Sequence, residues 1–181
     1  MILPIVHYGS ETLRKKSIAV PSVTRELAVL ASDMLETMYA AKGVGLAAQQ
    51  VGRTESLCVI DVPPDCEGDE ERLFNSRVRM PLVMFNPQIV AVSGTQEDNE
   101  GCLSFPKIGC PVSRPYEVVA SYTDVRGAPN TITVRGLLAR AVLHETDHLN
   151  GILFIDRASG AEKSKIEAKL AKLAKANGNV L

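Results

Sequence analysis

The spacing of apolar positions predicts one long helix near the start of the chain. Over residues 24–42, apolar side chains recur at intervals of three and four, which is the spacing of a single buried helix face. The positions are Leu27, Leu30, Ala31, Met34, Leu35 and Met38. Thr24 or Ser22 can cap the start of this helix, and Gly43 can end it.

Shorter apolar runs predict a set of strands in the middle of the chain. They cover residues 56–62, 81–92, 116–125 and 130–134. Asn86 and Pro87 interrupt the second run, and a turn at residues 126–129 joins the last two into a hairpin. The intervening stretch 63–81 is rich in charge, and we expect it to be a solvated, mobile loop.

Two further helices are expected in the last third of the chain. The first covers residues 136–150 and ends at Gly151. The second covers residues 160–176, with apolar residues on one face and lysines elsewhere, which is typical of an amphipathic surface helix. Such a basic helix either packs on the domain or binds an acidic partner such as RNA or a membrane.

Composition narrows the class of protein. The chain has 181 residues, 45% of them hydrophobic, and its 20 basic and 21 acidic residues leave a net charge of −1. These values fit one globular domain with an appended helix and argue against intrinsic disorder. A near-zero charge also argues against a protein that coats nucleic acid or an anionic membrane.

The cysteines indicate a reducing compartment. Cys58, Cys66, Cys102 and Cys110 are too few for a disulfide scaffold, and none forms a CxxC pair. We also find no run long enough to span a bilayer and no leader pattern at the start. The simplest prediction is a reduced, cytoplasmic protein.

The strongest chemical signal is the pentapeptide HETDH at residues 144–148. On a helix, His144 and His148 project from the same face one turn apart, so both imidazoles can bind one metal ion. Glu145 can then take a proton from a water molecule at that ion. A shuffled sequence of this composition contains HExxH with odds of roughly 0.2%, so coincidence is a poor explanation.

A catalytic metal site of this kind needs a third protein ligand, and the sequence offers two candidates. The residues after His148 do not continue as HxxGxxH, which excludes the metzincin class. Glu167 lies 19 residues after His148, as in thermolysin-like metallopeptidases, but Glu/Lys pairing on its own helix also explains it. Cys102 lies in a polar, glycine-containing segment, and its thiolate would be a strong ligand. Local grounds favour Cys102 without excluding Glu167.

Three separated segments resemble, in order, the signature motifs of peptide deformylases. They read GVGLAAQQ at residues 43–50, EGCLS at 100–104 and HETDH at 144–148. The opening segment 8–17 and the residues on either side of the histidines are also similar to that family. The resemblance covers about residues 2–157 and makes Cys102, rather than Glu167, the third metal ligand.

This resemblance implies an α+β fold, with mixed or antiparallel strands packed around the helix that carries the histidines. It implies an enzyme that hydrolyses the N-formyl group from the formylmethionine of newly synthesised proteins and releases formate. The implied cofactor is Fe²⁺, for which Zn²⁺, Ni²⁺ or Co²⁺ can substitute. The implied partners are N-formylmethionyl peptides and the ribosome, which the C-terminal helix could contact, with no requirement for nucleic acid or membrane.

The resemblance also assigns roles to individual residues. Cys102, His144 and His148 would hold the metal, and Glu145 would move the proton. The Gln50 side chain and the Leu103 backbone N–H would stabilise the oxyanion. Val44, Gly45 and Gly101 would border the peptide. An apolar pocket for the methionine side chain would draw on Val44, Leu137, Leu138, Ala141 and residues near Cys110.

Two departures from the family pattern concern the substrate. Gly109 stands where some members have an arginine that helps to hold the peptide, and Arg114 could contribute in its place. Leu143 stands where glutamine is common. We expect a catalytic domain over residues 1–157, with 63–81 as an extended loop inside it. Residues 158–181 would form a C-terminal helix, packed on the domain or partly free.

Overall fold

Two antiparallel sheets form the framework of the protein. The computed structural model describes residues 1–177. The larger sheet has the strand order β1-β2-β3-β6-β7, and the smaller one pairs β4 with β5. The strands of the larger sheet are β1 (Gly45–Ala47), β2 (Leu57–Ile60), β3 (Leu82–Ser93), β6 (Glu117–Thr123) and β7 (Pro129–Arg135). Those of the smaller sheet are β4 (Gln96–Gly101) and β5 (Gly109–Arg114), and every neighbouring pair in both sheets is antiparallel.

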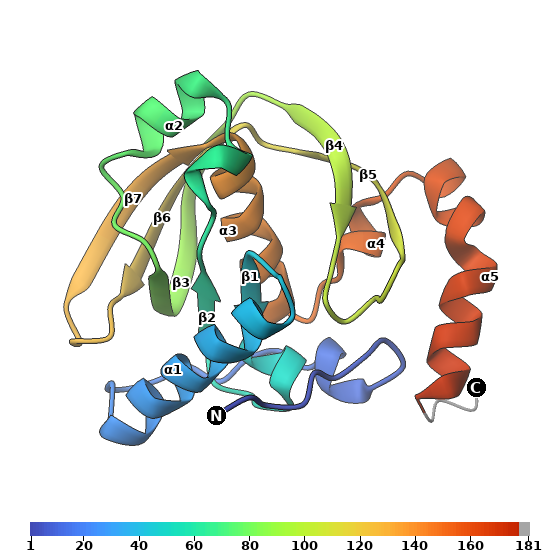
Figure 1. The fold of residues 1–181 in the computed structure, drawn as a ribbon, viewed down its shortest axis with the longest axis horizontal. Coiled ribbons are helices and arrows are strands. Elements are labelled where there is room, and N and C mark those ends of the chain that lie inside the picture. Colours follow the sequence, from blue (N-terminus) through green and yellow to red (C-terminus); the bar gives the residue numbers. More distant parts are fainter. Residues whose placement is uncertain (178–181) are drawn as a thin grey trace.

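Helix α3 (Gly136–Leu149) lies at the centre of this framework. Figure 1 shows it between the five-stranded sheet and the β4–β5 hairpin. Leu138, Ala139 and Val142 pack against buried residues of β2, β3, β6 and β7 in one core cluster. The fold is therefore α+β with strands around the histidine-bearing helix, as the sequence predicts.

Helix α1 (Arg25–Ala40) covers the other side of β1 and β2. The Thr24 side chain caps its start by accepting a hydrogen bond from the Leu27 N–H. Four positions of the predicted stripe are buried against β2 and β3, namely Leu30, Ala31, Met34 and Met38. The helix ends at Ala40 because Lys42, and not Gly43, adopts the left-handed conformation, with φ of 57°.

The charged stretch 63–81 is more ordered than the loop that the sequence suggests. It contains a 3₁₀ turn, Pro64–Cys66, and a short helix, α2 (Asp69–Asn75). The Asn75 side chain donates to the Arg135 carbonyl and accepts from the Arg135 N–H, at 3.1 and 3.0 Å. Tyr116 donates to Glu71, and the Arg135 guanidinium lies 3.8 Å from the Phe74 ring centre. Contacts with the edge of β7 therefore hold α2 in place.

The C-terminal elements pack on the hairpin. After α4 (Phe154–Arg157), helix α5 (Gly160–Ala176) buries Ile166 and Leu170 with residues of β5 and α4 in a third core cluster. Two 3₁₀ turns complete the fold, Glu11–Arg14 and Ala48–Val51. Residues 178–181 of the predicted C-terminal segment lie outside the described residues.

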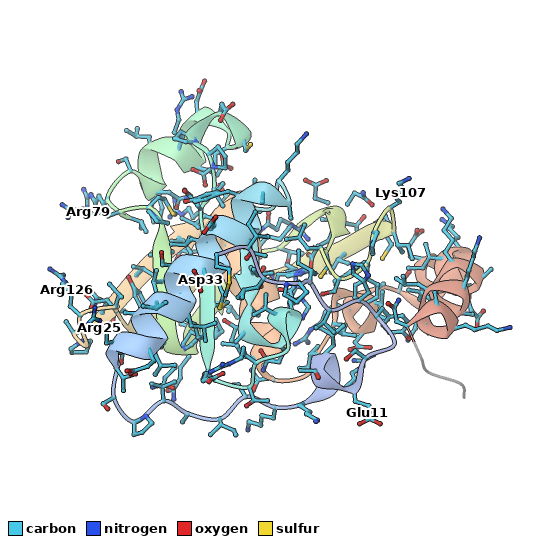
Figure 2. The ribbon with its side chains drawn as sticks, turned by 60° about the horizontal axis from the view of Figure 1, so that its bottom comes forward. Glu11, Arg25, Asp33, Arg79, Lys107 and Arg126 are labelled. Atoms are coloured by element: carbon cyan, nitrogen blue, oxygen red, sulfur yellow. The ribbon has the colours of Figure 1, made fainter. Side chains whose placement is uncertain are left out.

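The molecular surface carries many charged side chains. Figure 2 shows Glu11, Arg25, Arg79, Lys107 and Arg126 at the periphery of the molecule. Within residues 1–177, no helix is long and apolar enough to cross a membrane.

Candidate metal centre and active site

Three predicted ligands converge on one point beside α3. The Sγ atom of Cys102 lies 3.3 Å from Nε2 of His148, and the two histidine Nε2 atoms are 3.2 Å apart. Among the described residues, Cys102, His144 and His148 form a group whose ligand atoms all lie within 4.8 Å of one another. Both histidines are buried, and Cys102, just after β4, is half-buried.

This donor set fits a transition-metal ion. Bonds of about 2.1 Å to nitrogen and 2.3 Å to sulfur put neighbouring donors of a tetrahedral site roughly 3.5 Å apart, close to the spacings found here. One thiolate and two imidazoles are ligands typical of borderline metals such as Zn²⁺ and Fe²⁺. Three protein donors also leave one position open for a water molecule or substrate, as catalytic sites require.

A buried ion-pair network orients the first histidine. Glu100 accepts a hydrogen bond from Nδ1 of His144 at 2.6 Å, which leaves Nε2 to act as the ligand. Arg114 donates to both oxygens of Glu100, and Arg140 donates to one of them. Burial acts to raise the pKa of Glu100, but the hydrogen bonds from Arg114 and His144 hold it well below its usual range.

The same network accounts for the role of Arg114, which the sequence analysis considered as a peptide-binding residue. Arg114 is only 5% exposed, and its guanidinium joins Glu100 to Asp147 of α3. It does not line the cleft, so it cannot hold the peptide there. Sequence reasoning missed this network, although EGCLS contains Glu100 and HETDH contains Asp147.

Glu145 lies buried against the glycine-rich segment of β1. A Cβ atom built on Gly45 would lie 2.3 Å from its Oε1, so any larger residue at that position would have to displace the carboxylate. The other oxygen, Oε2, is buried and has no hydrogen-bond partner within residues 1–177. Burial raises the pKa of Glu145 to about 7. The carboxylate therefore lies close to Gly45, and one of its oxygens has no partner among the described residues.

Both polar atoms of the Gln50 side-chain amide have hydrogen-bond partners. Its Oε1 accepts a hydrogen bond from the Ala47 N–H at 2.8 Å. Its Nε2 lies 3.3 Å from Sγ of Cys102 and 3.3 Å from Oγ of Ser104. An N–H donor thus points at the metal-binding group, and Leu103 follows the thiolate ligand directly in the chain.

A cavity of about 610 Å³ opens in front of these groups. The predicted peptide-bordering residues Val44, Gly45 and Gly101 all line it. Of the residues expected around the methionine side chain, Val44, Leu137 and Ala141 also line it. Leu138 instead belongs to the core between α3 and the large sheet, and Cys110 is buried in the third core cluster. Ile108 and Gly109, which are near Cys110, line it as well, and Phe105 adds apolar surface that the sequence did not indicate.

Glu167, the alternative third ligand, lies outside the metal-binding group. It is exposed on α5 and is not part of the metal-binding group. The prediction of a site built from His144, His148 and Glu167 is therefore wrong. The physical reason is that Ile166 and Leu170 face the hairpin core, which turns Glu167 outward on the helix.

A Cys-His-His donor group and a buried, partly unpaired carboxylate, with Cys102, His144 and Glu145 lining one cleft, are the groups that a metal-dependent hydrolase of the α+β class uses. Comparison with known proteins gives the family. Residues 2–164 match the family model described as polypeptide deformylase. The chain therefore belongs to the polypeptide deformylase family, and it is a hydrolase that removes the N-formyl group from the formylmethionine of newly synthesised proteins.

Individual relatives agree with this assignment. The peptide deformylase of Opitutus terrae is 42% identical, covering 97% of this chain and 94% of the relative. That of Nitrosococcus oceani is 42% identical, covering 94% and 95%. Among solved structures, the Legionella pneumophila peptide deformylase has a TM-score of 0.82 at 36% identity over the full length of both chains. The Synechococcus elongatus enzyme, solved with actinonin, has a TM-score of 0.79 at 36% identity, covering 99% of this chain and 87% of the other.

Proposed function

We propose that Cys102, His144 and His148 hold Fe²⁺, for which Zn²⁺, Ni²⁺ or Co²⁺ can substitute, and that Glu145 moves the proton in formyl hydrolysis. The convergence of one sulfur and two nitrogen atoms beside the free oxygen of Glu145 carries the proposal. The bound cation supplies Lewis acidity to the formyl oxygen and lowers the pKa of water. Iron itself is suggested by the family resemblance.

The chain's own residues account for the remaining steps. Glu145 accepts a proton from the attacking water and later donates it to the departing amine, which frees the new N-terminus and leaves formate. Gln50 and the Leu103 backbone N–H donate hydrogen bonds to the formyl oxygen as it gains negative charge. Val44, Gly45 and Gly101 border the peptide, while Leu137 and Ala141 contribute to the pocket for the methionine side chain.

Formate release from formyl-Met-Ala-Ser by anaerobically purified, Fe²⁺-loaded protein tests this assignment. Glu145→Ala should keep its metal and lose most activity, because it removes the proton acceptor and no ligand. Cys102→Ala should lose metal affinity, and Glu167→Ala should keep both metal and activity. Absence of turnover in fully loaded native protein, or full activity of Glu145→Ala, would contradict the proposal.

The identity of the metal has a separate readout. A thiolate beside Fe²⁺ is readily oxidised, so exposure to air should abolish the activity of the iron form. The zinc form should lose much less activity, because Zn²⁺ has no redox chemistry. Metal analysis of protein prepared without oxygen tests which ion the protein carries.

We further propose that residues 1–157 form a cytoplasmic catalytic domain and that α5 contacts the ribosome. The lysines of α5 are exposed, whereas Ile166 and Leu170 are turned toward the domain. They are Lys163, Lys165, Lys169, Lys172 and Lys175. An exposed basic face suits the phosphate backbone of RNA, and such binding weakens steeply with salt. Cosedimentation with ribosomes across a salt series, with these lysines changed to glutamine, tests the contact.

A further inference from the structure

Two lysines stand at the entrance of the active-site cleft. Lys42 follows α1, and Lys107 lies between β4 and β5, so they come from separate segments that both line the cavity. Both residues are exposed, and Figure 2 shows Lys107 at the outer surface of the molecule. Neither takes part in the proposed chemistry.

The positive charge of these lysines is not neutralised within the protein. Among residues 1–177, neither has a carboxylate oxygen within 4.0 Å. The two carboxylates that line the cavity, Glu100 and Glu145, are 5% and 4% exposed and lie at its base. Glu100 is already paired with arginines, as described above. Among the residues that line the cleft, the exposed charge is therefore positive.

The backbone fixes both lysines at turns. Lys42 and Lys107 have φ values of 57° and 60°, in the left-handed region where glycine is the usual residue. Asn86 is the third residue other than glycine with positive φ within residues 1–177, and its side chain exchanges two hydrogen bonds with Val20. The lysines are held instead by backbone hydrogen bonds, since the Gly43 N–H donates to the Met38 carbonyl at the end of α1 and the Ile108 N–H donates to the Phe105 carbonyl. These turns hold both backbone segments at the cleft lining, and they leave the two side chains without a carboxylate partner within residues 1–177.

We propose that Lys42 and Lys107 favour formylated polypeptides that carry acidic side chains within the first few residues after formylmethionine. This inference rests on the proposed function, because it places the formylated polypeptide in the cleft that these lysines line. Charges near a protein surface attract with modest strength and mainly accelerate encounter. The expected preference for an acidic over a basic peptide is about three- to ten-fold in kcat/KM. It should appear in KM, because neither lysine touches the reacting atoms.

A matched peptide series tests the proposal on the metal-loaded enzyme. Formyl-Met-Ala-Glu-Ser amide, its glutamine counterpart and its lysine counterpart should rank in that order at low ionic strength. The differences in kcat/KM among the three peptides should disappear at about 0.5 M salt, where exposed charges are screened. Comparing formyl-Met-Ala-Ser as free acid and as amide separates a response to the terminal carboxylate from a response to the side chain. Equal kcat/KM for the three amides would overturn the proposal.

Variants test whether the preference for acidic peptides depends on these two lysines. The double variant Lys42→Gln with Lys107→Gln should lose the ranking and keep its kcat, whereas the double arginine variant should retain it. Lys16→Gln, which removes an exposed charge outside the cleft lining, is the matched control and should change nothing. A ranking that survives in the double glutamine variant would also overturn the proposal.

Binding gives a readout that does not depend on turnover. The Glu145→Gln protein should bind the intact acidic peptide with a lower Kd than the basic one, and equal Kd values would contradict the charge preference. Failure of the native, metal-loaded enzyme to release formate from any of the peptides would instead contradict the proposed function. The two failures are therefore distinguishable.

Discussion

Gly45 shows how the absence of a side chain can define an active site. Glu145 occupies the space that a Cβ atom at position 45 would need, with its Oε1 only 2.3 Å from that point. The φ angle of Gly45 is not positive, so the requirement for glycine comes from this close approach and not from the backbone conformation. The sequence suggests a turn here, but the role of Gly45 depends on a residue 100 positions away.

Gly45→Ala should therefore act as an active-site mutation without replacing any residue that takes part in the proposed chemistry. The new methyl group must displace the Glu145 carboxylate, and a shift of about 1 Å can cost on the order of 100-fold in rate. We expect kcat to fall by about this factor while metal content is unchanged. Formate release and metal analysis measure the two effects.

Gly160→Ala provides the control for this substitution. A Cβ atom at Gly160 meets nothing within 4 Å, and the residue lies at the start of α5, far along the chain from the site. It should leave activity unchanged. Full activity of Gly45→Ala would show that Glu145 relaxes without cost and is not held in place by this contact.

At the scale of elements, the sequence predicts the helices and strands whose own residues carry a recognisable apolar pattern. Helix α5 has the predicted bounds, and α1 ends two residues earlier than expected. Strand β4 was missed because its sequence, QEDNEG, has no apolar alternation. Helix α2 was missed because seven residues are too few for a stable isolated helix, and its contacts with β7 hold it. Both of these elements depend on pairing with other segments, as do strands β1 and β5, which were also missed.

The residues of the candidate site also fall into two groups, those that a sequence motif predicts and those that only the fold brings together. HETDH predicts two of the candidate metal ligands because the chemistry requires particular residue types at particular spacings, and the family resemblance supplies Cys102 as the third. The Glu100–Arg114–Asp147 network was missed because it needs β4, β5 and α3 to be adjacent. Charged residues in a sequence are usually solvated, so only their burial reveals this network.

The ion pair between Arg14 and Asp156 links the N-terminal 3₁₀ turn to α4 and predicts a pH effect on stability. Burial acts to raise the pKa of Asp156, but hydrogen bonds from Arg14 and from the Leu153 N–H lower it overall. A carboxyl whose pKa is lower in the folded state stabilises the protein above its unfolded pKa of about 3.9. That contribution disappears as the pH falls through the folded pKa.

Asp156→Asn should consequently lower the free energy of unfolding by about 0.5–1 kcal/mol near pH 7, a modest value because both side chains are partly exposed. The difference from the native protein should shrink as the pH approaches about 3.5. Urea denaturation of both proteins at each pH measures it, since other acid-sensitive groups are common to the two. A difference that is constant with pH would exclude the ion pair as its source.

At the scale of the whole molecule, the metal-binding group lies where separately packed parts meet. His144 and His148 belong to α3, which packs on the large sheet, whereas Cys102 follows β4 and packs with the hairpin core. Without a cation, a thiol and two imidazoles must share a space with ligand atoms only 3.2 and 3.3 Å apart. A bound ion therefore cross-links the hairpin to the central helix.

Metal removal should accordingly destabilise the entire domain. An ion that binds only the folded state at a free concentration of 1,000 times its Kd stabilises it by about 4 kcal/mol. For a domain of this size, that corresponds to a fall in Tm of about 10 °C when a chelator is added. Re-addition of the metal should restore the Tm, and calorimetry measures both changes. Cys102→Ala should start at the lower Tm and respond little to the chelator, because one arm of the cross-link is missing. An unchanged Tm after the measured loss of bound metal would show that the hairpin and α3 hold together without the ion.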